Sequence, residues 1–110
     1  MEIKNTKVNS EAIKFEIYNE DKLAGRAYLY IIKNDLHAEH YGYLEDVFLD
    51  ETFRGKGIGK ELMQKVIETA KEIGCYKIVA TCRFGKEGVH EFYKKLGFIE
   101  HGKSFRMNFK

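Results

Sequence analysis

The hydrophobic pattern of this chain changes its period near Gly57, and that change constrains the fold more than any other feature. Before it, residues 13–18 alternate between apolar and polar side chains, while residues 23–32 and 41–49 are rich in tyrosine, leucine and branched side chains. Both patterns are typical of β-strands. After it, apolar residues recur at helical spacing as far as Ile73, which predicts an amphipathic helix. We therefore expect strands first and then a helix.

The remaining residues predict a strand, a second helix and a closing hairpin. Gly74 ends the first helix, an apolar strand follows over residues 76–82, and a helix over residues 87–96 ends before Gly97. The side chains that this second helix is expected to bury are Val89, Phe92 and Leu96. Residues 98–109 predict a hairpin whose alternating apolar residues are Phe105, Met107 and Phe109.

This order of elements predicts an α/β (α+β) fold with a mixed, mostly antiparallel sheet and two main helices. The strand–helix–strand passage predicts one parallel pair with a right-handed crossover. A chain of 110 residues has room for one core, so we expect a single domain over residues 1–110. No apolar run approaches the roughly 18 residues of a membrane span, and no secretory signal is evident. We therefore expect a cytoplasmic protein that does not enter a membrane.

Charge is distributed unevenly along the chain. Residues 1–53 carry 6 Lys and Arg against 11 Asp and Glu, whereas residues 54–110 carry 13 against 6. Such asymmetry favours a basic surface suited to phosphates beside an acidic surface suited to a cation. Two solvated faces without function are the alternative. No metal site is expected, because His37 and His40 have no third ligand nearby, and Cys75 and Cys82 lie too far apart on one strand to form a disulfide.

The strongest local motif is the segment RGKGIGK, residues 54–60, between a predicted strand and the start of the first helix. Glycine lets the backbone approach a ligand closely, and a helix N-terminus offers unpaired N–H groups to an anion. The segment therefore predicts a phosphate or pyrophosphate site formed by Arg54, Gly55, Lys56, Gly57, Ile58, Gly59 and Lys60.

Two common phosphate-binding fingerprints do not fit this segment. The dinucleotide pattern GxGxxG would need glycine at Lys60 or at Leu62. A Walker A loop would need Ser or Thr at Gly57 or Glu61. Nucleotide hydrolysis and NAD redox chemistry are therefore disfavoured.

The segment resembles the signature [R/Q]xxGx[G/A] of the GNAT superfamily of N-acetyltransferases, matched by Arg54, Gly57 and Gly59. The resemblance covers residues 41–109, including YLEDVFLD, KIVATC and FYKKLGF. It implies that the loop amides bind the pyrophosphate of acetyl-CoA. It also implies that the pantetheine arm pairs with Val47, Phe48 and Leu49, and that Phe92 and Lys95 contact the coenzyme.

The same resemblance implies the catalytic residues. Glu45, within YLED, matches a proposed general base, with Asp46 as the alternative and as a substrate-binding neighbour. Strand alternation sends these two side chains to opposite faces unless a bulge intervenes, and burial in an apolar strand would hold a carboxylate as a usable base. Tyr93 matches the tyrosine that protonates the coenzyme thiolate, and backbone N–H groups near Val47 would polarise the thioester.

The acceptor stays open at this point. The YLED segment resembles both the glucosamine-6-phosphate and the spermidine/spermine acetyltransferases of the family, while the acidic first half favours a cationic small-molecule amine. Residues 1–49 predict strands and turns without the two helices that usually cover the acceptor site in the family, so the site should be shallow, or else a second subunit of a homodimer would complete it. Two alternatives are a coenzyme-binding protein without turnover and a nucleic-acid-binding module that uses Arg83, Lys94, Lys95, Lys103 and Arg106.

Overall fold

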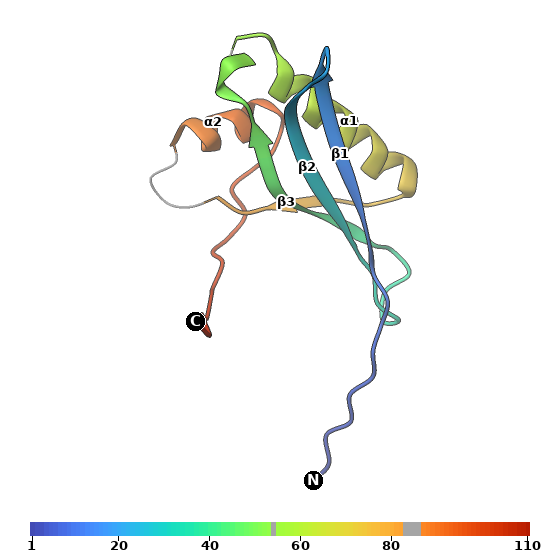
Figure 1. Cartoon of the computed structure of the whole chain (residues 1–110). Coiled ribbons are helices and arrows are strands. Elements are labelled where there is room, and N and C mark those ends of the chain that lie inside the picture. The colour runs from blue at the N-terminus through green and yellow to red at the C-terminus, as the bar shows by residue number, and fades with distance from the viewer. Residues whose placement is uncertain (54, 83–86) are drawn as a thin grey trace. The chain divides into compact units, whose positions relative to one another are not determined.

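The computed structural model of the chain describes residues 1–53, 55–82 and 87–110 (Figure 1). These residues form two compact units, residues 1–80 and residues 81–110. Arg54, in the glycine loop, and Arg83, in the basic set, lie outside the described residues. The expectation that residues 1–110 form one domain stays a prediction.

The first unit holds one four-stranded sheet, a short 3-10 helix and one α-helix. Its elements in chain order are β1 Glu11–Asn19, β2 Lys22–Ile32, β3 Tyr41–Leu49, η1 Glu51–Phe53, α1 Ile58–Ile73 and β4 Ile78–Ala80. The strands lie in the order β1-β2-β3-β4. β1 and β2 are antiparallel, β2 and β3 are antiparallel, and β3 and β4 are parallel. The predicted mixed, mostly antiparallel sheet with one parallel pair is confirmed.

Helix α1 covers one face of this sheet, behind the strands as Figure 1 shows them, and contacts β1, β2 and β3. Its apolar stripe is buried at helical spacing, and the matching stripe of β2 is buried at alternate positions. The buried side chains are Ala24, Ala27, Leu29 and Ile31 of β2, Leu44 of β3, and Leu62, Met63, Val66 and Ala70 of α1. Gly74 ends the helix in the left-handed conformation, and its N–H donates to the carbonyls of Ala70 and Lys71.

Strand β4 is shorter than the sequence predicts. It spans Ile78–Ala80 because only these three residues pair with β3, opposite Gly42, Tyr43 and Leu44. Before it, the Lys77 carbonyl accepts the Gly42 N–H at 3.0 Å and the Tyr76 N–H donates to the His40 carbonyl at 3.1 Å, whereas residues 81–82 of the expected range are not part of a strand. An apolar run identifies the segment, but the length of the strand depends on which of its residues pair with a neighbour, and β3 itself continues to Leu49 beyond the last pair.

The second unit contains helix α2, Glu87–Lys95. The predicted helix is confirmed, and Gly97 follows it with a φ of 102°. The expected burial of Val89 is wrong, since 42% of this residue is exposed, whereas Phe92 and Leu96 are half-buried. The aromatic contacts of this unit join Phe92, Tyr93 and Phe98, and Val89 lies one helical turn before them.

The predicted closing hairpin is wrong. Residues 98–110 contain no strand, and Phe105, Met107 and Phe109 are exposed by 93, 78 and 90%. Alternating apolar residues favour a strand only where a neighbouring strand accepts its backbone hydrogen bonds. None of the described residues pairs with this segment. Within the described ranges, no helix is long and apolar enough to cross a membrane.

Candidate functional site

The candidate site begins at a free edge of β3. The parallel pairing between β3 and β4 ends where Leu44 meets Ala80, although β3 continues to Leu49. On its other side, β3 stays paired with β2 as far as Leu49, which lies opposite Gly25. Residues 45–49 therefore present backbone donors and acceptors that no described strand satisfies on the β4 side. A ligand with its own amide groups can pair with such an edge.

A β-bulge interrupts β3 at Asp46. Tyr28 lies opposite Glu45 and Arg26 lies opposite Phe48, so Asp46 and Val47 together face the single residue between them on β2. Asp46 has a φ of 51°, a left-handed conformation that aspartate tolerates better than most side chains. A bulge of this kind bends a strand and re-aims its side chains.

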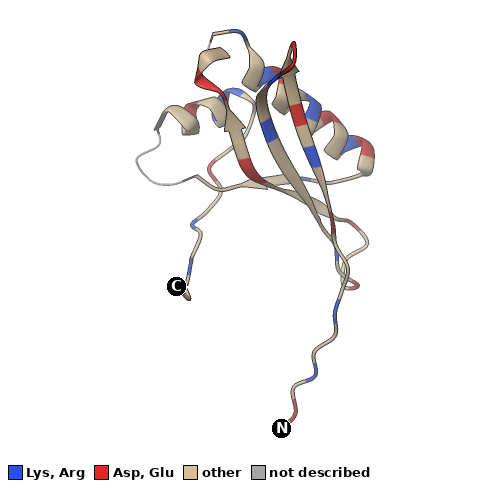
Figure 2. Cartoon of the chain, viewed as in Figure 1, with Lys and Arg blue, Asp and Glu red and all other residues tan. Residues whose placement is uncertain are grey.

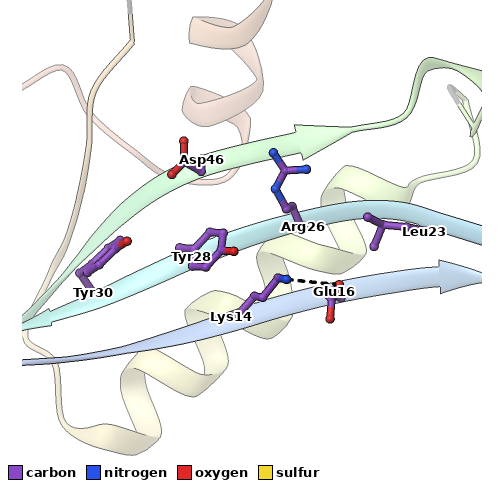
Figure 3. Close-up of a pocket in the computed structure, with 7 residues that line it drawn as sticks. All are labelled: Lys14, Glu16, Leu23, Arg26, Tyr28, Tyr30 and Asp46. Carbon is purple, nitrogen blue, oxygen red and sulfur yellow. Dashed lines mark ion pairs between the residues drawn. The ribbon is translucent and has the colours of Figure 1, made fainter.

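The bulge brings both acids of the YLED segment to one face of the sheet. Directly opposite residues in an antiparallel pair share a face, so Glu45 lies on the face of Tyr28. Asp46 lines an open depression on that same face (Figure 3). The expected separation of the two acids by alternation does not occur. The expected burial is also wrong, because Glu45 and Asp46 are both exposed.

The depression has a volume of about 640 Å³ and crosses β1, β2 and β3. Figure 3 shows Tyr28 and Tyr30 side by side on β2, with ring centroids 6.4 Å apart. The lining residues are Lys14, Glu16, Leu23, Arg26, Tyr28, Tyr30 and Asp46. This face therefore combines aromatic rings with charges of both signs. Figure 2 shows where basic and acidic residues lie along the strands.

A compact turn joins β3 to the glycine loop. The Asp50 N–H donates to the carbonyl of Ala24 at 2.8 Å, which fixes the end of β3 beside β2. Asp50 Oδ1 accepts the Thr52 N–H at 2.9 Å and the Thr52 hydroxyl at 2.8 Å. These hydrogen bonds, the backbone one first, hold the pKa of Asp50 below its usual value. The first turn after β3 is thus closed by one side chain.

The glycine loop leads directly into α1. Gly55 and Gly57 have φ values of 85° and 73°, and a side chain at either position would be strained by the backbone conformation. Gly57 occupies the N-cap position and provides no side-chain cap. The first N–H that bonds back within the helix is that of Glu61, to the carbonyl of Gly57. Among the described residues, Gly59 and Lys60 have no such bond to the carbonyls of Gly55 and Lys56, and N–H groups at a helix start suit an anion.

Two lysines lie beside this helix start. Lys56 Nζ is 5.6 Å from the centroid of the Phe53 ring, and both Lys56 and Lys60 are exposed. The Phe48 ring lies 5.0 Å from the Arg26 guanidinium carbon, and Phe48 and Leu49 are each 37% exposed. The free strand edge, an apolar flank and a positively charged helix start thus succeed one another along residues 45–60.

Three other predicted site residues lie on α2, in the second unit, namely Phe92, Tyr93 and Lys95. The Tyr93 ring packs against Phe92 and Phe98, with centroid distances of 5.6 and 5.3 Å. The Tyr93 carbonyl accepts the N–H of Phe98 at 3.0 Å, which closes the turn after the helix. Tyr93 is half-buried, and Lys95 is exposed.

Cys75 and Cys82 are free thiols, and partial burial raises the pKa of both. His40 Nε2 lies 3.2 Å from the carbonyl oxygen of Ile73. In the ranges that the structure describes, no three His, Cys, Asp or Glu side chains form a group that could hold a metal ion.

The sequence did not predict the bulge at Asp46, the early end of β4 or the role of Asp50. The Asp50-Glu51-Thr52 segment does carry a local signal, because an aspartate often accepts the N–H two residues later. A left-handed aspartate inside a strand has no comparable signal. Its effect appears only when the register of the neighbouring strand is known.

The model of the acetyltransferase (GNAT) family matches residues 3–98, and the chain belongs to this family. Among curated relatives, the "Probable glucosamine 6-phosphate N-acetyltransferase 2" of Oryza sativa subsp. japonica is 39% identical over 61 residues, which are 56% of this chain and 35% of the relative. The "Glucosamine 6-phosphate N-acetyltransferase" of Trypanosoma brucei brucei is 37% identical over 61% of this chain and 44% of the relative.

Solved structures agree with this assignment. The glucosamine-6-phosphate N-acetyltransferase from Arabidopsis thaliana has a TM-score of 0.80 at 28% identity, over 90% of this chain and 67% of that one. A putative acetyltransferase from Agrobacterium tumefaciens has a TM-score of 0.82 at 30% identity, over 88% of this chain and 68% of that one. The chain spans less than half the length of the curated relatives named above.

Proposed function

We propose that this chain binds acetyl-CoA and transfers its acetyl group to the amine of a small molecule. The observation that carries the proposal is the continuity of the free β3 edge, residues 45–49, with the uncapped start of α1 at Gly57. One extended ligand with amide groups at one end and phosphates at the other would match this order. Membership of the GNAT family supports the same ligand.

In this proposal, the N–H groups of Ile58, Gly59 and Lys60, at the start of α1, bind the pyrophosphate. Lys56 and Lys60 add positive charge, and Gly57 leaves the approach open, since no atom lies within 4 Å of the position that its Cβ would occupy. Arg54 completes the family signature in the sequence. The pantetheine amides pair with the free edge at Val47, Phe48 and Leu49, as an added strand would.

The proposed chemistry needs a neutral amine, a polarised thioester and a proton for the departing thiolate. Glu45, or Asp46 beside it, accepts a proton from the acceptor ammonium, directly or through water. A backbone N–H near Val47 donates to the thioester oxygen as negative charge develops there. The amine nitrogen forms a bond to the carbonyl carbon, the C–S bond breaks, and Tyr93 supplies the proton that the sulfur takes up. The acylated nitrogen then loses its second proton, which returns through water to the Tyr93 phenolate, so the net proton released is the one held by the carboxylate.

For the acceptor, the proposal is a cationic amine at the face that carries Glu45 and Asp46. Both carboxylates are exposed, and within the described chain neither takes part in an ion pair or a hydrogen bond of its side chain. Tyr28 and Tyr30 add aromatic faces that attract a cation. The named relatives act on glucosamine 6-phosphate, whose amine would meet the same carboxylates while Lys14 and Arg26 met the phosphate.

The first test is calorimetric titration with acetyl-CoA. We expect micromolar-range binding by the unaltered chain and its loss in Gly57→Asp, which adds a strained, negatively charged side chain at the helix start. Gly102→Asp is the matched control, because it adds the same charge at an exposed glycine without a positive φ. Equal binding by Gly57→Asp and Gly102→Asp would contradict the phosphate site.

The second test is an acceptor screen with acetyl-CoA that follows release of free thiol. The panel holds polyamines, aminoglycoside-like amines, lysine-like amines and amino sugar phosphates. Turnover of cationic amines supports the proposed acceptor class. Turnover of amino sugar phosphates alone would replace that class, while the acetyl transfer itself would stand.

A further inference from the structure

The outer edge of β1 is unoccupied by any described strand. β1 lies at the end of the sheet and pairs only with β2. Its nine residues, Glu11–Asn19, have half-buried apolar side chains at alternate positions. A long free edge of this kind can template pairing with another chain, so proteins usually cover it or protect it with charge.

A groove runs along this edge between β1 and α1. It has a volume of about 390 Å³, and its apolar wall includes Phe15, Ile17 and Leu62. Glu61, Lys65 and Glu68 of α1 form its outer side. Apolar side chains at the edge of the core are therefore accessible next to unpaired backbone groups, which is the combination that an added strand would bury.

The sequence of this edge is complementary to itself. In Ile13-Lys14-Phe15-Glu16-Ile17, the apolar positions read the same in both directions, while the two charges exchange sign. When two such strands lie antiparallel with Phe15 at the centre, Ile13 faces the partner's Ile17 and Lys14 faces the partner's Glu16. Opposite charges directly across an antiparallel pair are stabilising, and like charges are destabilising.

Other registers lose this match. A shift that centres Lys14 or Glu16 places a charge against its own copy. A register whose two-fold axis falls between Lys14 and Phe15 places Lys14 of one copy opposite Phe15 of the other. It therefore mixes the apolar face with the charged one. Only the register centred on Phe15 aligns apolar with apolar and positive with negative along the whole segment.

We propose that β1 is an interface between two copies of this chain, in which the β1 strands pair antiparallel about Phe15 and join two sheets into one continuous sheet. On the α1 side, the Phe15 side chains of both copies cover the two grooves. On the opposite side, each Lys14, now 3.7 Å from its own Glu16, also faces the partner's Glu16. The contact is isologous, so every interaction occurs twice.

The charge pattern provides a sharp test by sedimentation velocity over roughly 5 to 500 µM chain. We expect the unaltered chain to approach twice its mass of 12.9 kDa as the concentration rises. Lys14→Glu and Glu16→Lys should each weaken dimerisation, by about tenfold or more, because each places like charges opposite at two symmetric positions. An equimolar mixture of these two variants should dimerise again, since every cross-strand pair is then opposite in charge. The double variant K14E/E16K should dimerise alone for the same reason.

Glu72→Lys serves as the control, because it makes the same charge change as Glu16→Lys at an exposed position of α1 outside the groove. It should leave the association constant unchanged. An unaltered chain that stays monomeric over the whole range, as it would if residues 1–10 covered the edge, overturns the proposal. So does a dimer that survives both single variants, or a mixture of the two that remains monomeric.

Discussion

The carboxylate of Asp50 accepts two hydrogen bonds from one residue, Thr52, at 2.9 Å from its N–H and at 2.8 Å from its hydroxyl. The pair closes the turn between β3 and the glycine loop, so it fixes the direction in which the chain leaves the sheet. Both bonds favour the charged form, which is why the pKa of Asp50 is lowered.

This pair predicts a pH dependence of stability. A lowered pKa in the folded state contributes stability above the unfolded value, near 3.9, and that contribution is lost as the pH falls through the folded pKa. Titration of the Asp50 carboxyl carbon by NMR should give a midpoint below about 3.9. Thr52→Val removes one bond and should raise that midpoint, whereas Thr69→Val, whose hydroxyl donates to Lys65, should not change it. An unshifted Asp50 midpoint in the unaltered chain would contradict the turn.

Two glycines predict stability changes of opposite sign. A Cβ atom on Gly25 would lie 2.9 Å from the Phe48 carbonyl oxygen and 3.1 Å from Leu49 Cδ2. Because a carbonyl within the sheet cannot easily move, Gly25→Ala should lower the free energy of unfolding by about 1–3 kcal/mol. A Cβ atom on Gly88, in α2, would meet no described atom within 4 Å. Helix propensity alone should therefore make Gly88→Ala raise the free energy of unfolding by about 0.5 kcal/mol. Urea unfolding of both variants checks the two signs. Equal stability of both would show that β2 and β3 do not approach closely at Gly25.

Periodicity was sufficient to predict β1, β2, β3 and α1. The alternation at Ile13, Phe15 and Ile17 and the helical stripe from Leu62 to Ala70 follow from which face each element buries. The positions of Gly74 and Gly97 also predicted where the two helices end. Both residues have the positive φ that is typical of the residue after a helix.

Features that depend on a neighbour were not predictable in the same way. The exposure of Phe105 and the short span of β4 depend on which strands pair, and a period of two does not reveal a partner. The bulge at Asp46 joins two acids on one face only because the register with Arg26 and Tyr28 shifts there. The sequence therefore predicted the motif of the site, but it did not predict how the two carboxylates of the site are arranged.

Substitutions at the two acids should separate the proposed base from its neighbour. Glu45→Gln and Asp46→Asn each remove a charge and keep the side-chain shape, and asparagine tolerates the left-handed conformation at position 46. If Glu45 is the base, Glu45→Gln should lower kcat by about 10²–10⁴-fold, while Asp46→Asn should mainly raise KM for a cationic acceptor. Steady-state kinetics with saturating acetyl-CoA measures both. The reverse pattern would make Asp46 the base, and full activity of both variants would remove the acid pair from catalysis.

Tyr93→Phe tests the proposed proton donor. Phenylalanine keeps the ring that packs against Phe92 and Phe98, so the change isolates the hydroxyl. We expect kcat and kcat/KM to fall together by about 10²-fold or more, because the hydroxyl is needed when the thiolate leaves and not when the coenzyme binds. The dissociation constant for acetyl-CoA should stay nearly unchanged.

Tyr30→Phe, on the sheet face of β2, is the control for loss of a hydroxyl elsewhere. It should leave coenzyme binding intact and change at most the KM for the acceptor. Full turnover by Tyr93→Phe would mean that water or another group protonates the thiolate, and weakened acetyl-CoA binding without a change in kcat would make Tyr93 a coenzyme contact.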